Sequence, residues 1–144
     1  MPALPAAERA RLEQAYRATT YRVNAPSGDI DLRLGEPSPA LATLLSEAGV
    51  VHWAIVTAWN PASKLRDTAA NEAAHARLHE WLSGKGYCWL PGANCANAGD
   101  WPPEVSCVVL GMPEAAALQC GSEFGQVAVV TGDGEAIPRL NWCC

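Results

Sequence analysis

The residues Val50–Val56 form a nearly continuous apolar run that is rich in β-branched and aromatic side chains. Runs of this length and composition are typical of a strand buried on both faces of a sheet. The run ends in the more polar stretch Thr57–Ser63, where Pro61 biases the residue before it toward an extended conformation. A helix is predicted to follow over Asp67–Trp81. The polar stretch therefore lies between the end of a buried strand and the start of a helix, where α/β proteins commonly bind ligands.

The rest of the chain divides into short periodic segments separated by Gly, Pro and Asn. Apolar residues at helical spacing predict further helices, and alternating or continuous apolar residues predict further strands. The helices are expected at 5–18, 38–49, 67–81 and 113–124, and the strands at 19–23, 29–34, 50–56, 87–90, 104–110, 126–130 and 137–142. Residues 91–103 are expected to form a long loop. The prediction is an α+β protein, one domain over 1–144, with a single mixed β-sheet covered by helices.

Composition and charge limit the class of protein. The chain has 144 residues, of which 49% are hydrophobic and 17% charged, as expected for a compact soluble domain. No apolar run reaches the roughly 20 residues that a membrane helix requires, and no signal peptide is recognisable, so a cytoplasmic location is expected. The net charge of −5 argues against a general nucleic-acid binder. However, nine of the ten Lys and Arg residues lie at or before Lys85, which leaves a basic surface on the first half as an alternative.

The six cysteines do not follow a metal-binding spacing. In a cytoplasmic protein we expect them to be reduced thiols, with Cys107 and Cys120 as small core residues. Cys88 and Cys95 are too far apart for a zinc knuckle, and the terminal pair Cys143–Cys144 makes a poor metal corner. No metal and no cofactor are therefore expected.

Polar side chains near strand and helix ends are the candidate ligand-binding residues. They are Thr57, Asn60, Ser63, Asn71, Ser106 and Gln126, to which Trp101 is added as a side chain on the long loop that could cover a site. Amide and hydroxyl groups suit a small neutral or lightly charged ligand such as a nucleoside, a sugar or an amide. The alternative is that Asn60 and Ser63 only stabilise their own turn through side-chain to backbone hydrogen bonds.

Glu104 is the candidate catalytic residue, as a proton acceptor or donor. Its apolar neighbours in the strand favour partial desolvation, which raises the pKa of a carboxyl group. A second group for paired acid–base chemistry is not evident, and a salt bridge from Glu104 to Arg17, Arg22 or Arg66 is the structural alternative.

Two histidines on the predicted helix 67–81 have spacing that also occurs in zinc sites. His75 and His79 are four residues apart on one side of the helix, with Glu72 one turn before them. The metalloprotease pattern requires Glu directly after the first His, and Ala76 stands there instead. A solvated helix flank is therefore the expected explanation.

Several short motifs resemble a bacterial family, the domain of unknown function numbered three-two-nine-three. The motifs are Tyr16-x-x-Thr19-x-Tyr21-x-Val23, Thr57-Ala58-Trp59-Asn60-Pro61-x-Ser63, Asn71 with Leu78, Trp101-x-x-Glu104-x-Ser106, Gly111 and Phe124-Gly125-Gln126. The sequence departs from the family pattern at Pro103 and in its cysteine content. The resemblance implies a small bacterial cytoplasmic protein and brings no known reaction, substrate or partner.

The leading hypothesis is a protein that binds a small polar or nucleotide-like ligand at the end of the 50–57 strand. If the protein is an enzyme, it processes the same ligand there. The first alternative is a protein-interaction module, in which Trp101 serves as an aromatic anchor for a protein partner. The second is nucleic-acid binding through the arginines of the first half. The leading hypothesis requires Asn60 and Glu104 to meet on the same side of the sheet.

Overall fold

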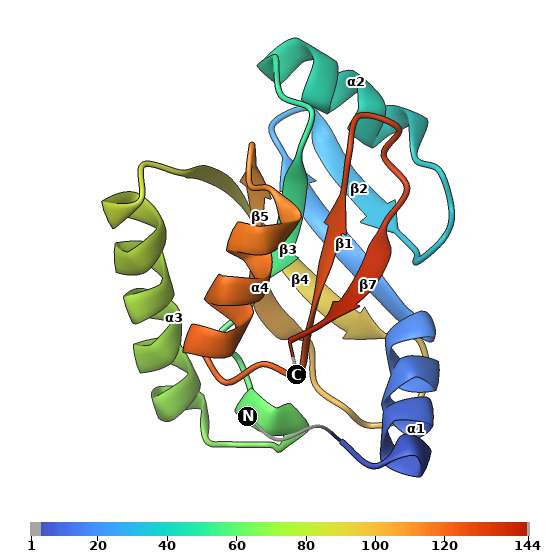
Figure 1. The fold of residues 1–144 in the computed structure, drawn as a ribbon, viewed down its shortest axis with the longest axis vertical. Coiled ribbons are helices and arrows are strands. Elements are labelled where there is room, and N and C mark those ends of the chain that lie inside the picture. The colour runs from blue at the N-terminus through green and yellow to red at the C-terminus, as the bar shows by residue number, and fades with distance from the viewer. Residues whose placement is uncertain (1–3, 144) are drawn as a thin grey trace.

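A single seven-stranded sheet organises the chain in the computed structural model, which describes residues 4–143. Cys144 lies outside the described residues. The elements are α1 (Ala6–Arg17), β1 (Thr19–Ala25), β2 (Gly28–Leu32), α2 (Pro39–Ala48), β3 (Trp53–Val56), the short 3-10 helix η1 (Pro61–Ser63), α3 (Thr68–Gly84), β4 (Cys88–Ala96), β5 (Glu104–Leu110), α4 (Glu114–Glu123), β6 (Ala128–Gly132) and β7 (Arg139–Trp142). The α+β class and the predicted order of helices and strands are confirmed (Figure 1).

The pairing within the sheet is antiparallel throughout, so the predicted mixed sheet is wrong in this respect. The strand order is β2-β1-β4-β5-β3-β6-β7, and each neighbouring pair is antiparallel. Two helices, α3 and α4, each join strands that run in the same direction, as expected of crossovers. In both cases another strand lies between the joined strands: β5 separates β3 from β4, and β3 separates β5 from β6. The crossovers therefore create no parallel pair.

Local signals fix the ends of two helices. The Ser38 hydroxyl accepts a hydrogen bond from the backbone N–H of Leu41 at the start of α2, and Gly49 ends that helix with φ +72°, a conformation that favours glycine. The Asp67 carboxylate accepts from the backbone N–H of Ala70 at 2.8 Å at the start of α3. This cap fixes the entry of the chain into α3, whose first turn carries a residue of the candidate site.

The strand β4 is longer than expected. Residues 91–96 continue it, and only 97–103 remain as a loop. Pro91 is tolerated in this strand because β1 pairs with β4 only from Gly92 onward, so at Pro91 the strand has a sheet neighbour on one side only. The extension places Asn94 in the sheet, directly opposite Glu104 on β5.

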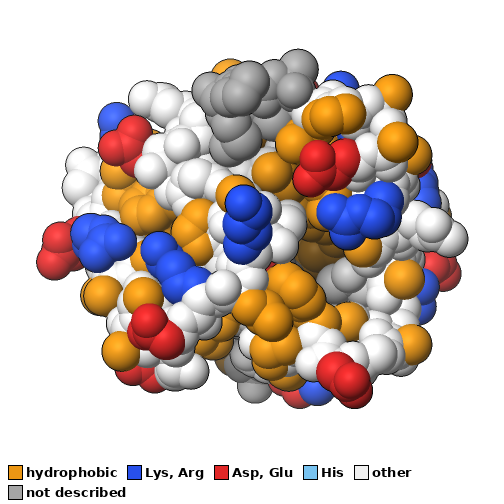
Figure 2. Space-filling view, turned by 90° about the horizontal axis from the view of Figure 1, so that it is seen from below, with side chains coloured by type: hydrophobic (Ala, Val, Ile, Leu, Met, Phe, Trp, Pro, Cys, Tyr) orange, Lys and Arg blue, Asp and Glu red, His pale blue; other side chains and the backbone are white. Residues whose placement is uncertain are grey.

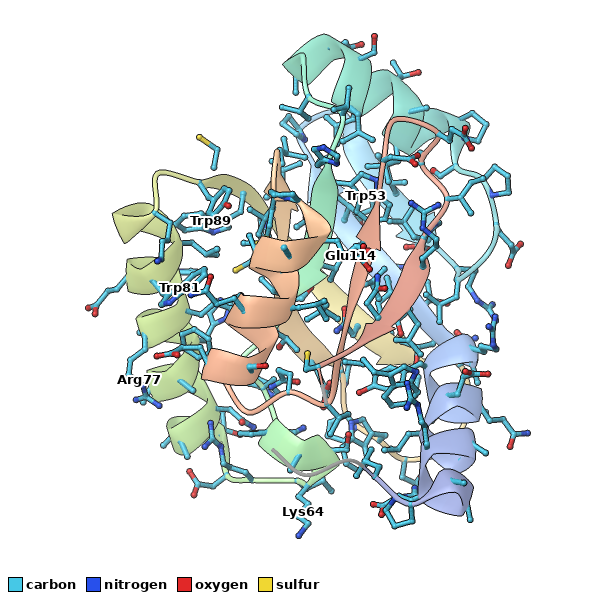
Figure 3. The ribbon with its side chains drawn as sticks, viewed as in Figure 1. Trp53, Lys64, Arg77, Trp81, Trp89 and Glu114 are labelled. Carbon is cyan, nitrogen blue, oxygen red and sulfur yellow. The ribbon has the colours of Figure 1, made fainter. Side chains whose placement is uncertain are left out.

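Each face of the sheet carries its own apolar core. On one face, residues of β3, β5 and β6 pack against α3 and α4, around Val56, Leu78 and Cys107. On the other face, Trp53, Ile55 and neighbours pack against α2. Trp81 of α3 and Trp89 pack against the first core, and Trp53 belongs to the second (Figure 3). Farther along the second face, α1 packs through Leu12 on β6 and β7.

Replacing Gly132 with alanine is expected to lower the free energy of unfolding by about 2 kcal/mol. A Cβ at this position would lie 2.6 Å from Nε1 of Trp53, which is fully buried and donates from Nε1 to the carbonyl of Asp133. The indole would have to move within a packed core. Gly134→Ala is the matched control, because no atom lies within 4 Å of a Cβ built there. Urea denaturation should separate the two variants, and equal stabilities would contradict the packing described here.

Among residues 4–143, no helix has the length and apolar character needed to cross a membrane.

Candidate functional site

The polar stretch after β3 folds into a strained turn. Asn60, Ala62 and Ser63 all have positive φ values, +46°, +57° and +57°, which non-glycine residues adopt at a cost of about 1–3 kcal/mol each. Two contacts to the segment that follows α4 hold the turn: Ala62 N–H donates to the carbonyl of Gly125, and Gln126 Nε2 donates to the carbonyl of Trp59. Strained backbone that is held by its surroundings is common at functional sites.

Asn71 fixes the turn from behind. This residue of α3 is 2% exposed, and its Oδ1 accepts from Asn60 N–H at 2.9 Å while its Nδ2 donates to Asn60 Oδ1 at 2.9 Å. Arg66 joins the same network, because its backbone N–H donates to Asn60 Oδ1 and its Nε donates to Asn71 Oδ1. With its oxygen occupied in this way, the Asn60 amide can present only its Nδ2 group toward β5.

The Asn60 Nδ2 group donates to Glu104 Oε2 at 2.8 Å, so the two residues do meet on one side of the sheet. Trp101 Nε1 donates to the same oxygen at 3.0 Å. Within residues 4–143 no Lys, Arg or His lies within salt-bridge distance of Glu104, and the expected alternative of a salt bridge is wrong. Arg17 pairs with Glu13, Arg22 with Asp31, and the Arg66 guanidinium bonds to α3.

The carboxyl of Glu104 has a perturbed pKa. Burial raises the pKa above its ordinary value of 4.5, and the hydrogen bonds from Asn60 and Trp101 oppose that shift. A carboxylate without a cationic partner, held by two neutral donors in a partly dry environment, is a strong acceptor for a ligand hydrogen bond or proton.

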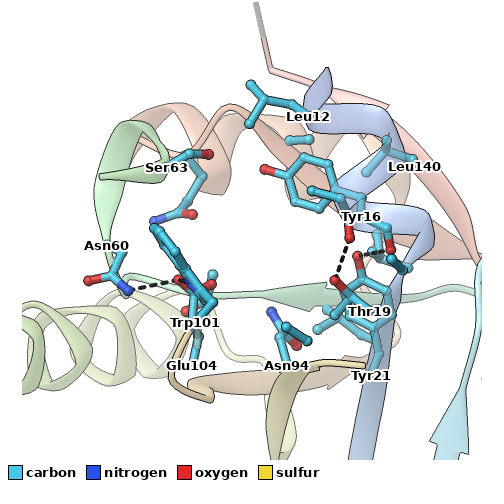
Figure 4. A pocket seen from close by; sticks show the side chains of 18 of the residues that line it. Leu12, Tyr16, Thr19, Tyr21, Asn60, Ser63, Asn94, Trp101, Glu104 and Leu140 are labelled. Atoms are coloured by element: carbon cyan, nitrogen blue, oxygen red, sulfur yellow. Dashed lines mark hydrogen bonds between the residues drawn. The ribbon is translucent and has the colours of Figure 1, made fainter. Parts of the chain in front are cut away.

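Glu104 forms part of the wall of a cavity of about 310 Å³. The cavity lies between α1, η1, the 97–103 loop and the sheet, and Figure 2 shows a hollow at this end of the molecule with hydrophobic side chains inside it and cationic side chains at its border. In Figure 4, Asn60, Ser63, Trp101 and Glu104 lie on one side of the space, and the residues of α1 and β1 lie on the other.

The opposite wall was missed by the sequence analysis. Thr19 and Tyr21 of β1 line it, together with Leu12 and Tyr16 of α1 (Figure 4). Tyr21 donates its hydroxyl to the carbonyl of Tyr16, and burial is the largest cause of a raised pKa for its phenol, which therefore stays protonated. The alternation Thr19-x-Tyr21 was visible in the sequence, but nothing local indicated which face of the sheet these side chains would occupy.

Asn94 lies between the two walls. It pairs with Tyr21 on one side and with Glu104 on the other, so the three residues form one row across β1, β4 and β5. Its Oδ1 is buried, and none of the described residues donates a hydrogen bond to it. A buried acceptor without a partner is rare in proteins, and here it lines a cavity.

Six of the eight residues predicted for the site line this cavity: Thr57, Asn60, Ser63, Trp101, Glu104 and Gln126. The Thr57 hydroxyl is already used, because it donates to the carbonyl of Val105 and accepts from Trp59 N–H. The other two predicted residues, Asn71 and Ser106, are buried but do not line the cavity. Ser106 Oγ has no hydrogen-bond partner among the described residues. A Cβ at position 92 would lie 2.9 Å from this oxygen, so the hydroxyl fits only because residue 92 is a glycine.

The raised pKa of Glu104 leads to a pH-dependent stability. Because the folded carboxyl binds a proton more readily than the unfolded one, the free energy of unfolding should fall as pH rises from the ordinary pKa through the folded pKa. Glu104→Gln removes this contribution. The stability of the variant relative to the wild type should therefore increase with pH across that window, as measured by urea denaturation between pH 4 and pH 7. A difference that does not change with pH would show that the carboxyl is not desolvated.

Comparison with known families places part of the chain in a described family. A family model described as "Protein of unknown function (DUF3293)" matches residues 56–129, about half of the chain. The matched segment runs from the end of β3 to β6 and contains all eight predicted site residues, whereas the opposite wall from α1 and β1 lies outside it. No curated protein and no solved structure shows significant similarity to the chain.

Proposed function

We propose that this chain, which belongs to the DUF3293 family of proteins of unknown function, binds a small polar molecule in the cavity at the end of β3. The ligand class is neutral or lightly charged, such as a nucleoside, a sugar or an amide. The observation that carries the proposal is the Glu104 carboxylate, which is held at the cavity wall by Asn60 and Trp101 and has no ion-pair partner in residues 4–143. Such a group gains most from a ligand that donates a hydrogen bond.

The remaining polar groups of the cavity support the same ligand class. Asn94 Oδ1 is a second acceptor without a donor among the described residues. Gln126 donates from Nε2 to two backbone carbonyls, and its Oε1 accepts no hydrogen bond from the described residues. Three acceptors around the cavity favour a ligand with several N–H or O–H groups. The volume of about 310 Å³ is at the lower end for small-molecule sites, which favours a ligand of nucleoside size or smaller.

A catalytic role for Glu104 is part of the proposal. Burial raises the pKa of the Glu104 carboxyl, so it accepts a proton more readily than an exposed carboxylate does. Tyr21 on the opposite wall has a protonated phenol. Because β4 lies between β1 and β5, the backbones of Tyr21 and Glu104 are about 10 Å apart. A ligand between them would meet the Glu104 carboxylate on one side and, on the other, the Tyr21 hydroxyl, whose proton is donated to the Tyr16 carbonyl and whose oxygen can accept a hydrogen bond. The proposed location is the bacterial cytoplasm.

The two alternative functions have less support. Trp101 is 40% exposed, as a protein-interaction anchor requires, but its indole N–H is engaged by Glu104 and its side chain lines the cavity. Among the arginines considered for nucleic-acid binding, Arg17 and Arg22 are engaged by carboxylates and Arg9 lies over the Trp142 ring. A gel-shift measurement at low salt with duplex and single-stranded DNA should therefore show no complex.

The test is a ligand screen by thermal shift and ligand-observed NMR, using nucleosides, sugars and amides with their phosphorylated counterparts as matched controls. Neutral compounds should raise the melting temperature, and the phosphorylated counterparts should raise it less because they bring negative charge toward Glu104. Preferential binding of the phosphorylated compounds, or no binding in any class at millimolar concentration, would overturn the proposal.

A further inference from the structure

Two helical histidines and a strand cysteine come together on the face of the sheet opposite the cavity. His75 and His79 lie one turn apart on α3, and Cys107 of β5 faces the same helix in the core shared with Leu78. One candidate ligand atom from each of the three side chains lies within 4.8 Å of the other two. Glu72, one turn before them on the helix, is exposed, and the third side chain beside the histidines is Cys107, which the sequence predicts only as a core residue.

The donor set suits a zinc ion. Zinc binds thiolate sulfur at about 2.3 Å and imidazole nitrogen at about 2.0–2.1 Å, and sites with three protein ligands keep a fourth position for water or substrate. In a tetrahedral site these bond lengths place ligand atoms roughly 3.3–3.7 Å apart. Because the observed separations are 4.8 Å or less, the ligand atoms would have to approach one another by at most about 1.5 Å. The two histidines have the i, i+4 spacing with which one helix presents two imidazoles to a metal.

The surroundings of the histidines leave a polar atom unsatisfied. His75 Nδ1 is buried, and none of the described residues hydrogen-bonds to it. Trp59 contacts the His75 ring edge-on, with 6.1 Å between ring centroids, and Trp89 packs against His79 at 5.0 Å. Each imidazole thus packs against an indole. A bare imidazole nitrogen in such a place is costly unless it meets a donor or a metal.

We propose that His75, His79 and Cys107 form a zinc site on the α3 face of the sheet. The site is separate from the cavity, because Cys107 and Glu104 point to opposite faces of β5. Binding displaces the thiol proton of Cys107, so that two neutral imidazoles and one thiolate hold the ion. A metal here would clamp α3 to β5, and through Asn71 at the start of α3 it would stiffen the turn that carries Asn60.

The test uses the full chain without an affinity tag, reduced, stripped with a chelator and then loaded with Zn²⁺. After gel filtration, elemental analysis should find about one zinc per chain, and loading should raise the melting temperature. His79→Ala and Cys107→Ala should each weaken zinc binding at least about tenfold. Loading with Co²⁺ should give a thiolate-to-cobalt absorption band that is absent from Cys107→Ala.

The matched controls are a histidine and a cysteine that lie outside the proposed site. His52→Ala removes the remaining histidine, which is exposed, and Cys120→Ala removes the other buried thiol. Both should keep the zinc content and the cobalt band of the wild type. Because His79 is only half-buried, its variant should fold even if Cys107→Ala does not. An unmodified chain that takes up no zinc, or a His79→Ala variant that binds zinc as tightly as the wild type, would overturn the proposal.

Discussion

Asn71→Ala is expected to lower the free energy of unfolding by about 3 kcal/mol and the melting temperature by roughly 10 °C. Asn71 is 2% exposed and exchanges two hydrogen bonds of 2.9 Å with Asn60, whose own exposure is also 2%. Alanine would leave the backbone N–H of Asn60 without this acceptor in a buried position. An unpaired buried polar group costs about 1–3 kcal/mol, and the truncated side chain adds a small cavity.

The same substitution should also reduce ligand binding, because the strained turn at Asn60 loses its support. Asn24→Ala is the matched control: Asn24 is exposed, and its Nδ2 donates to Asp29 across a hairpin at 3.0 Å. That variant should lose less than about 1 kcal/mol. Urea denaturation of the two variants measures the difference. If Asn71→Ala costs no more than Asn24→Ala, the network behind the turn is not a structural anchor.

Glu104→Gln is expected to weaken ligand binding by about 10- to 150-fold while the fold is retained. A glutamine has nearly the same shape, and its Oε1 can still accept from Asn60 Nδ2 and Trp101 Nε1. What it loses is the negative charge. A hydrogen bond to a charged group contributes about 1.5–3 kcal/mol, which corresponds to that range of affinity.

Isothermal titration calorimetry with a hit from the screen measures the effect. Glu135→Gln is the matched control, since Glu135 is exposed in the turn between β6 and β7 and lies outside the cavity. It should bind the ligand as the wild type does. A Glu104→Gln variant that unfolds at a much lower temperature would instead assign Glu104 a structural role, in which its charge supports the turn.

The local features of this fold could be predicted from the sequence. Ser38 with Gly49 marked the ends of one helix, and the apolar run ending at Val56 marked the central strand, because these signals act over a few residues. The hypothesis that Asn60 and Glu104 meet came from their positions at the ends of two predicted buried strands, and the pairing of β3 with β5 brings them together.

The non-local features could not be predicted. Nothing in the sequence indicated that β5 would insert between β3 and β4, which makes every pair antiparallel. Pro91 and Gly92 suggested a loop, yet the strand continues because β1 pairs only beyond Pro91. The wall formed by Tyr21 comes from a segment more than 80 residues before Glu104, and it joins the site only through the strand order.

The most direct test of the cavity as a ligand site is the indole N–H resonance of Trp101 in a ¹H–¹⁵N correlation spectrum, assigned with Trp101→Phe. This N–H donates to Glu104, whereas the N–H of Trp53 donates to Asp133 on a distant part of the sheet and serves as an internal control. Addition of a ligand from the screen should shift the Trp101 resonance in proportion to occupancy and leave that of Trp53 unchanged. A ligand that binds without moving the Trp101 resonance would contradict the assignment of the site to this cavity.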